Sequence, residues 1–101
     1  MEKRKPHHDL GSFKAAMSTV DRLSMTRTAQ MSAFELGCGR AEVVAALQSL
    51  ERKHFYKSMT ANWNNRQWQD VYHLPWNGMT LYVKFTDSAL TTFQLLSFKE
   101  K

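Results

Sequence analysis

The spacing of hydrophobic residues divides the chain into a helical first half and an extended second half. In the first half, apolar residues recur at intervals of three and four, which is the period of an α-helix with one buried face. The ranges expected to be helical are 9–20, 26–36 and 40–50. After residue 52 the period changes to two, as in a half-buried strand. The ranges expected to be strands are 54–60, 67–74, 79–86 and 92–99.

Capping and turn residues mark the ends of these elements. Asp9 or Ser12 is suited to cap the first helix, and Ser24 or Thr26 the second. Gly37 is placed to end the second helix. Pro75-Trp76-Asn77-Gly78 joins two strands, and Asn-Gly is typical of a tight hairpin. The short connections predict antiparallel neighbours. We therefore expect one α+β domain over 1–101, with N-terminal helices packed on one face of a C-terminal antiparallel β-sheet.

Strand alternation assigns the side chains to two faces of this sheet. Leu81, Val83 and Phe85 point one way, toward the helices, and we expect Leu96 and Phe98 to join them. The parity of 54–60 is ambiguous, because Lys57 shares its side with Phe55 and Met59. A buried, unpaired lysine is costly, which favours the open face for Lys57. The predicted open face carries Lys57, Gln69, Tyr82 and Lys99, with His73 and Lys84 at its margin.

The composition of the chain limits the classes of protein to which it can belong. The chain has 101 residues, a net charge of +5, four histidines and a single cysteine. One cysteine excludes an internal disulfide, and no apolar run approaches the length of a membrane span. No histidine or cysteine spacing matches a zinc site, so we expect no metal and no cofactor. The N-terminus lacks the apolar core of a secretory signal, and we expect a cytoplasmic protein. The positive charge favours a polyanionic partner such as nucleic acid.

The open face has the residue types that RNA cleavage requires. Attack by a 2′-hydroxyl on the adjacent phosphate needs a base, positive charge on the developing phosphorane and a proton for the leaving oxygen. Lys57 can act as base only if its pKa falls, and a neighbouring lysine and partial burial would both lower it. Tyr82 can donate a hydrogen bond, and Gln69 can orient the phosphate or the 2′-hydroxyl. The same four side chains also fit a merely solvated face.

Other polar and aromatic residues leave alternatives open. Residues 1–8 form either a solvated tail or an arm that contacts phosphates. Tyr56 and Trp76 are candidates to stack on unpaired bases. Asp70 faces the apolar side by parity, where it would satisfy a buried partner, with an arginine as one candidate.

Several sequence blocks resemble the MqsR family of bacterial toxins, which are mRNA interferases of the RelE-like superfamily. The blocks are MEKR with Pro6-His7, FYKSMT at 55–60, WQDVY at 68–72 and SFKEK at 97–101. The resemblance implies a RelE-like microbial RNase fold and cleavage of mRNA at GCU-like triplets without a metal. It assigns catalysis to Lys57, Gln69, Tyr82 and Lys99, and substrate recognition to Tyr56 and Met59.

The resemblance also implies a partner, an MqsA-like antitoxin with a zinc domain and a DNA-binding domain. Two departures from the family pattern stand out. His73 occupies a position where the family leads us to expect an arginine, which bears on phosphate contact or cleavage preference. The loop after Thr86 is slightly longer. We therefore expect the toxin of a type II toxin–antitoxin pair. The alternatives are a non-catalytic RNA-binding module on the same face and a protein-interaction domain.

Overall fold

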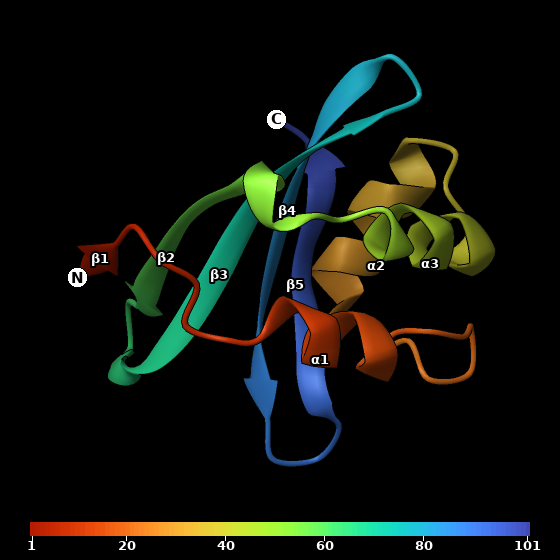
Figure 1. The fold of residues 1–101 in the computed structure, drawn as a ribbon. Coiled ribbons are helices and arrows are strands. Elements are labelled where there is room, and N and C mark those ends of the chain that lie inside the picture. Colours follow the sequence, from red (N-terminus) through yellow and green to blue (C-terminus); the bar gives the residue numbers. More distant parts are fainter.

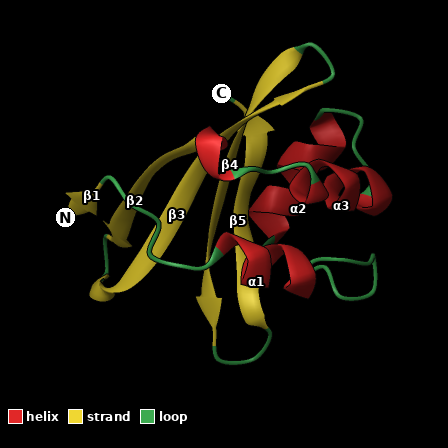
Figure 2. Cartoon of the chain, viewed as in Figure 1, coloured by secondary structure: helices red, strands yellow, loops and turns green.

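A five-stranded antiparallel sheet is covered on one face by three helices, as the computed structural model of residues 1–101 shows (Figure 1). The helices are α1 (Leu10–Ala16), α2 (Arg27–Glu35) and α3 (Arg40–Gln48), followed by the 3₁₀ helix η1 (Arg52–His54). The strands are β1 (Glu2–Lys3), β2 (Phe55–Ala61), β3 (Asn64–Trp76), β4 (Met79–Ser88) and β5 (Thr92–Glu100). The predicted α+β fold is confirmed, and Figure 2 shows α1, α2 and α3 on the same side of the sheet.

The sheet is a meander in which the strands lie in chain order, β1 to β5. Each strand pairs antiparallel with the next. At the β3–β4 hairpin, Asn77 and Gly78 have φ angles of 49° and 80°. Two positive φ angles match the twist of a two-residue hairpin, which explains why Asn-Gly stands there.

The helices begin and end where their capping residues predict. The Asp9 carboxylate accepts a hydrogen bond from the Ser12 amide at 2.9 Å, so Asp9 is the cap of α1. Thr26 caps α2 in the same way, and Gly37 follows it with a φ of 77°. The expected extension of the first helix to residue 20 is wrong, because α1 ends at Ala16 before Ser, Thr and Val residues of lower helix propensity. No helix has the length and hydropathy to cross a membrane.

The core lies between the helices and the sheet. The Phe13 ring of α1 stacks on Phe85 of β4 with centroids 3.6 Å apart, and the Phe93 ring meets both edge-on. The segment before α2 is tied to β5 by backbone hydrogen bonds from Thr26 to Leu95 and from Leu95 to Ser24. These contacts fix the helical layer over β4 and β5 and leave the opposite face of the sheet uncovered.

The N-terminal segment is an edge strand and not a solvated tail. Glu2 pairs with Met59, and Lys3 with Ser58. The chain then crosses the helix-facing side of β2 and β3 before it enters α1, as Figure 1 shows. On this path the amides of His7 and His8 donate to the Asp70 carboxylate at 2.9–3.1 Å. Sequence pattern did not predict β1, because a strand of two residues has no period to detect.

Two β-bulges change the predicted alternation. One lies between Phe55 and Lys57, so Phe55 packs toward the core while Tyr56 joins Lys57 on the open face. The second lies in β5 opposite Lys84 and Phe85. There Leu95 is buried in the core and Leu96 is not, the reverse of the strict period-two expectation. An extra residue in one strand shifts every later side chain to the other face.

Candidate functional site

The open face of the sheet holds the predicted site residues in three cross-strand rows. The first row contains His73, Tyr82 and Lys99, which are successive partners on β3, β4 and β5. The Lys99 ammonium lies 5.4 Å from the centre of the Tyr82 ring. Tyr56 of β2 extends this row, because its ring stacks on His73 at 4.2 Å. His73 therefore lies within the face and not at its margin.

The other two rows lie further along the same strands. Lys57 and Lys84 flank the fully buried Val71 in the second row. Met59 and Gln69 are partners in the third. Gln69 and His73 are four positions apart on β3, which places the third row about 13 Å from the first. Lys57 lies one row from Tyr82 and Lys99 and one row from Gln69, whereas Gln69 is two rows from Tyr82 and Lys99.

Lys57 is held by an acidic residue that sequence pattern did not single out. Its ammonium lies 2.6 Å from the Glu2 carboxylate on β1. The hydrogen bond to Glu2 raises the pKa of Lys57, and the same bond lowers the pKa of Glu2. The expectation that the pKa of Lys57 falls is therefore wrong. At neutral pH Lys57 is a cation and not a base.

The lowered lysine pKa occurs at Lys84 instead. Burial lowers the pKa of Lys84, and the positive charge of Lys99 lowers it further. These are the two causes expected for Lys57 on β2, but they act together on Lys84, two strands away on β4. At Lys57 burial also lowers the pKa, but the hydrogen bond to the Glu2 carboxylate of β1 outweighs it.

Tyr82 and His73 of the first row are both neutral at neutral pH. Burial raises the pKa of the Tyr82 phenol, partly offset by the charge of Lys57. Tyr82 is thus a hydrogen-bond donor. Burial lowers the pKa of His73 below its ordinary value of 6.5, and the charge of Lys101 acts in the same direction. The His73 imidazole can therefore accept a proton.

A hollow of about 330 Å³ adjoins these rows at the third one. It is lined by residues of β2, the β2–β3 turn, β3, β4 and β5: Met59, Thr60, Asn62, Trp63, Gln69, Lys84 and Leu96. Gln69 is only 4% exposed, and no protein group hydrogen-bonds its side-chain amide. The hollow is therefore lined by a polar side-chain amide that has no hydrogen-bond partner within the protein.

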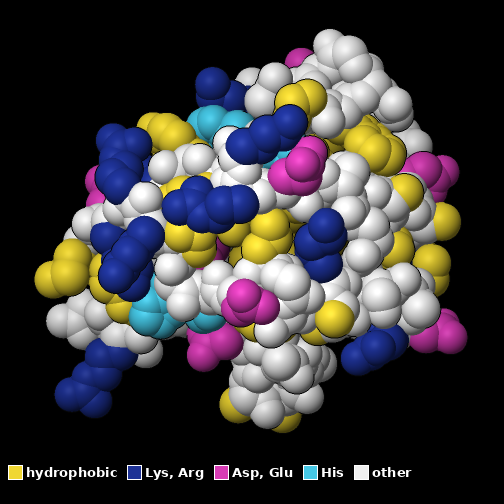
Figure 3. All heavy atoms as spheres, in the orientation of Figure 1, with side chains coloured by type: hydrophobic (Ala, Val, Ile, Leu, Met, Phe, Trp, Pro, Cys, Tyr) yellow, Lys and Arg dark blue, Asp and Glu magenta, His cyan; other side chains and the backbone are white.

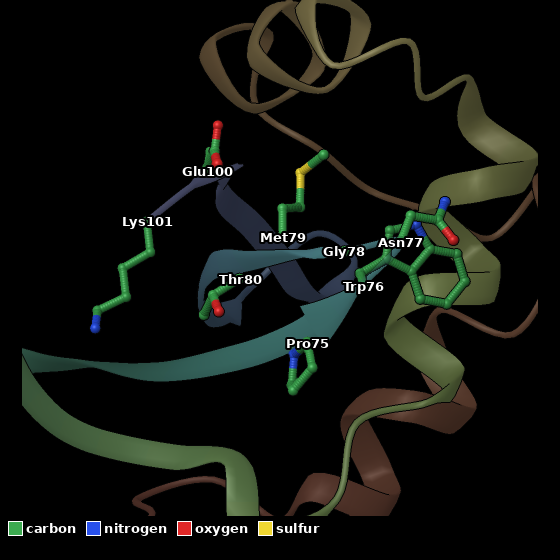
Figure 4. A pocket seen from close by; sticks show the side chains of 8 residues that line it. All are labelled: Pro75, Trp76, Asn77, Gly78, Met79, Thr80, Glu100 and Lys101. Carbon is green, nitrogen blue, oxygen red and sulfur yellow. The ribbon is translucent and has the colours of Figure 1, made fainter.

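A second hollow, of about 750 Å³, lies at the β3–β4 hairpin and does not have the features of a reactive site. Figure 4 shows its side chains diverging, with Met79 and Glu100 on one side and Pro75 on the other. The Trp76 ring packs against the core, and its indole N–H is buried without a partner. Trp76 is therefore not available to stack on a base, contrary to expectation.

Asp70 has a structural role, although its partner is not an arginine. Its fully buried carboxylate accepts a hydrogen bond from the Ser58 hydroxyl at 2.6 Å as well as those from His7 and His8. A buried carboxylate needs such donors. Asp70 therefore anchors the N-terminal segment, and this segment carries Glu2 to Lys57.

Neither the histidines nor the cysteine assemble into a metal site. No three His, Cys, Asp or Glu side chains are grouped closely enough to hold a metal ion. Burial raises the pKa of the Cys38 thiol, so it stays protonated and weakly nucleophilic.

Positive charge extends beyond the open face. Figure 3 shows the helix-facing side, where Lys and Arg side chains gather over the half occupied by the N-terminal segment and the β2–β3 hairpin. Lys3 lies 4.2 Å from the Trp68 ring in this region, and Arg4 lies 5.8 Å from the Tyr56 ring. The edge between the two faces is therefore cationic, as a nucleic-acid partner would require.

Comparison with known proteins agrees with the sequence blocks. A family model described as motility quorum-sensing regulator, toxin of MqsA, matches residues 5–100. The mRNA interferase toxin MqsR of Escherichia coli (strain K12) is 35% identical over 101 residues, which cover 100% of each chain. The family model spans the helical layer and strands β2 to β5, and the match to the E. coli protein includes β1 as well. The predicted resemblance is confirmed, and the chain belongs to the MqsR toxin family.

Proposed function

We propose that this protein is a toxin that cleaves messenger RNA at GCU-like triplets without a metal ion. The open face of its sheet would carry out the cleavage. The observation that carries the proposal is the grouping of Lys57, Lys84 and Lys99 around the neutral Tyr82 phenol. The E. coli relative is named an mRNA interferase, and this chain matches it from end to end.

In the proposed reaction, the 2′-hydroxyl attacks the adjacent phosphorus and the bond to the 5′-oxygen breaks. The products are a 2′,3′-cyclic phosphate and a 5′-hydroxyl. Lys57 and Lys99 would stabilise the negative charge of the phosphorane, and the Tyr82 phenol would donate a hydrogen bond to it.

The 2′-hydroxyl proton needs an acceptor that is neutral in the ground state. His73 is such a group on this face, because burial lowers its pKa below the ordinary value of 6.5. It would accept this proton more readily than Lys57, whose pKa is raised. Lys57 carries its proton and can supply it to the leaving 5′-oxygen. Tyr56 and Met59 would contact the substrate beside the reacting phosphate.

The description of the matching family names MqsA as the partner of the toxin. We therefore infer that an MqsA-like antitoxin would hold this protein inactive. The antitoxin would have to cover the open face or prevent RNA from reaching it. The three lysines make a phosphate-binding surface that an acidic partner could neutralise.

The test is primer extension on a long mRNA incubated with the purified protein in chelator. Discrete stops at a recurring triplet are expected, and Lys57→Ala should lower the cleavage rate about a hundredfold, as for loss of one group that stabilises a transition-state charge. Lys53→Ala is the matched control, because it removes an exposed lysine away from the open face. Intact RNA with the folded wild-type protein would contradict the enzyme proposal and favour the RNA-binding module.

A further inference from the structure

Trp63 is a large exposed aromatic side chain at the tip of the β2–β3 hairpin. It lies in the two-residue connection between Ala61 and Asn64 and is 76% exposed. The other two tryptophans are packed. The Trp68 ring stacks on His7 with centroids 5.3 Å apart, and Trp76 packs against the core. Trp63 stacks on no ring of the protein, so the face of its indole is free to contact a ligand.

The Trp63 side chain lies beside the hollow that contains the Gln69 amide. Asn62 and Trp63 line this hollow from the hairpin tip, and Met59 and Lys84 line it from the sheet. Trp63 also lines another hollow, of about 540 Å³, together with Met1 and the neighbouring residues of the hairpin. The indole therefore borders two open spaces, one of which is also lined by the Gln69 side chain, whose amide has no hydrogen-bond partner within the protein.

These groups together match a nucleobase. An aromatic ring stacks on the face of any unpaired base, and a Gln side chain offers one donor and one acceptor to its edge. Lys84 lines the same hollow and belongs to the row that also holds Lys57. A nucleotide with its phosphate at these lysines would place its base, or the base of its neighbour, near the hollow.

We propose that this hollow takes one unstacked nucleobase of a single-stranded RNA substrate, stacked on Trp63 and read at its edge by Gln69. The inference rests on the RNA-cleaving function proposed above and adds Trp63 as a residue that positions the substrate. It also accounts for the separation of Gln69 from Tyr82, because a group that reads a base need not reach the phosphate.

The experiment measures binding of a short RNA that carries a 2′-O-methyl group at the cleaved nucleotide, so that binding is separated from cleavage. A series of these RNAs has a single abasic nucleotide at each position in turn. Trp63→Ala should weaken binding of the intact RNA on the order of tenfold, the size of one base–aromatic stack. With one abasic RNA of the series, wild type and Trp63→Ala should bind equally. Trp63→Phe should retain binding within about threefold, because it keeps a stacking face.

Leu90→Ala is the matched control. Leu90 is 94% exposed between β4 and β5, so the change removes exposed apolar surface at another hairpin tip. It should leave binding unchanged. Wild-type affinity in Trp63→Ala, or the same loss with every abasic RNA, would overturn the base-stacking proposal and point to a protein partner for Trp63. If the wild-type protein cleaves mRNA but either of these two outcomes is found, only the base-stacking inference fails. If wild type neither cleaves mRNA nor binds the RNA, the proposed function fails as well.

Discussion

At the scale of single residues, the Glu2–Lys57 ion pair fixes the charge that the open face presents. Its two charged atoms lie 2.6 Å apart, and the Lys57 side chain is 23% exposed against 59% for Glu2. An RNA phosphate approaching Lys57 must compete with the Glu2 carboxylate. We therefore expect the ion pair to weaken RNA binding, while it raises the pKa of Lys57.

Glu2→Gln tests this competition. The substitution keeps the shape of the side chain and removes its charge, so the pKa of Lys57 should fall toward the ordinary 10.5. The affinity for an uncleavable RNA should rise about two- to fivefold, as expected from loss of an exposed ion pair. NMR titration of the lysine side chains gives the pKa, and fluorescence anisotropy gives the affinity.

Glu35→Gln is the control for this measurement, because it removes an exposed carboxylate at the end of α2. A lower RNA affinity in Glu2→Gln would show that Glu2 arranges Lys57 for the substrate and does not compete with it.

At the scale of elements, the N-terminal segment joins the core to the site. Asp70 on β3 receives hydrogen bonds from the His7 and His8 amides and from Ser58 on β2. Through this anchor the segment reaches the sheet edge, where the Thr60 amide donates to the carbonyl of Met1 at 2.9 Å. The position of Glu2 thus depends on a buried carboxylate on the opposite face of the sheet.

Asp70→Ala should destabilise the fold by about 3 kcal/mol, because it leaves buried donors unsatisfied. In a domain of this size that loss corresponds to a fall in Tm on the order of 15 °C, measurable by circular dichroism. Trypsin should then cleave after Lys3 or Arg4 before it cleaves elsewhere. Asp21→Ala, at an exposed aspartate, is the control. An unchanged Tm in Asp70→Ala would show that the segment does not depend on this anchor.

The sequence predicted the regular elements well, and the irregular ones poorly. Helical and alternating periods located three helices and four strands, since both reflect burial on one side. The bulges at Tyr56 and Leu96 could not be located in this way. One extra residue reverses the face to which the following side chains point, but it leaves the residue types of the strand unchanged. The strand β1 is specified by its partners, Met59 and Ser58, which lie far away in the chain.

At the scale of the whole molecule, the sheet separates packing from chemistry. One face is occupied by the helices and the N-terminal segment, and the other carries lysines, Tyr82 and His73. The open-face residues could be predicted because alternation needs only local sequence. The pKa values could not, because they depend on which charges other strands bring close. Glu2 is 55 positions from Lys57 in the chain, as their numbers show.

The two faces of the sheet also explain why the sequence blocks shared with the MqsR family are informative about both fold and site. FYKSMT and WQDVY lie on β2 and β3, which supply residues to both faces of the sheet. They contain Ser58 and Asp70 of the buried anchor as well as Lys57 and Gln69 of the open face. A shared block therefore identifies the fold and the site together, but it does not separate their roles.

The most direct test of the account is the chemistry of the RNA ends after cleavage in chelator. Attack by the 2′-hydroxyl on this lysine-rich face predicts a 2′,3′-cyclic phosphate on one product and a 5′-hydroxyl on the other. Mass spectrometry of a short cleaved RNA distinguishes these ends, and a substrate with 2′-deoxyribose at the cleaved nucleotide should remain intact. A 3′-hydroxyl with a 5′-phosphate, or cleavage of the deoxy substrate, would contradict the account, because water and not the 2′-hydroxyl would then be the nucleophile.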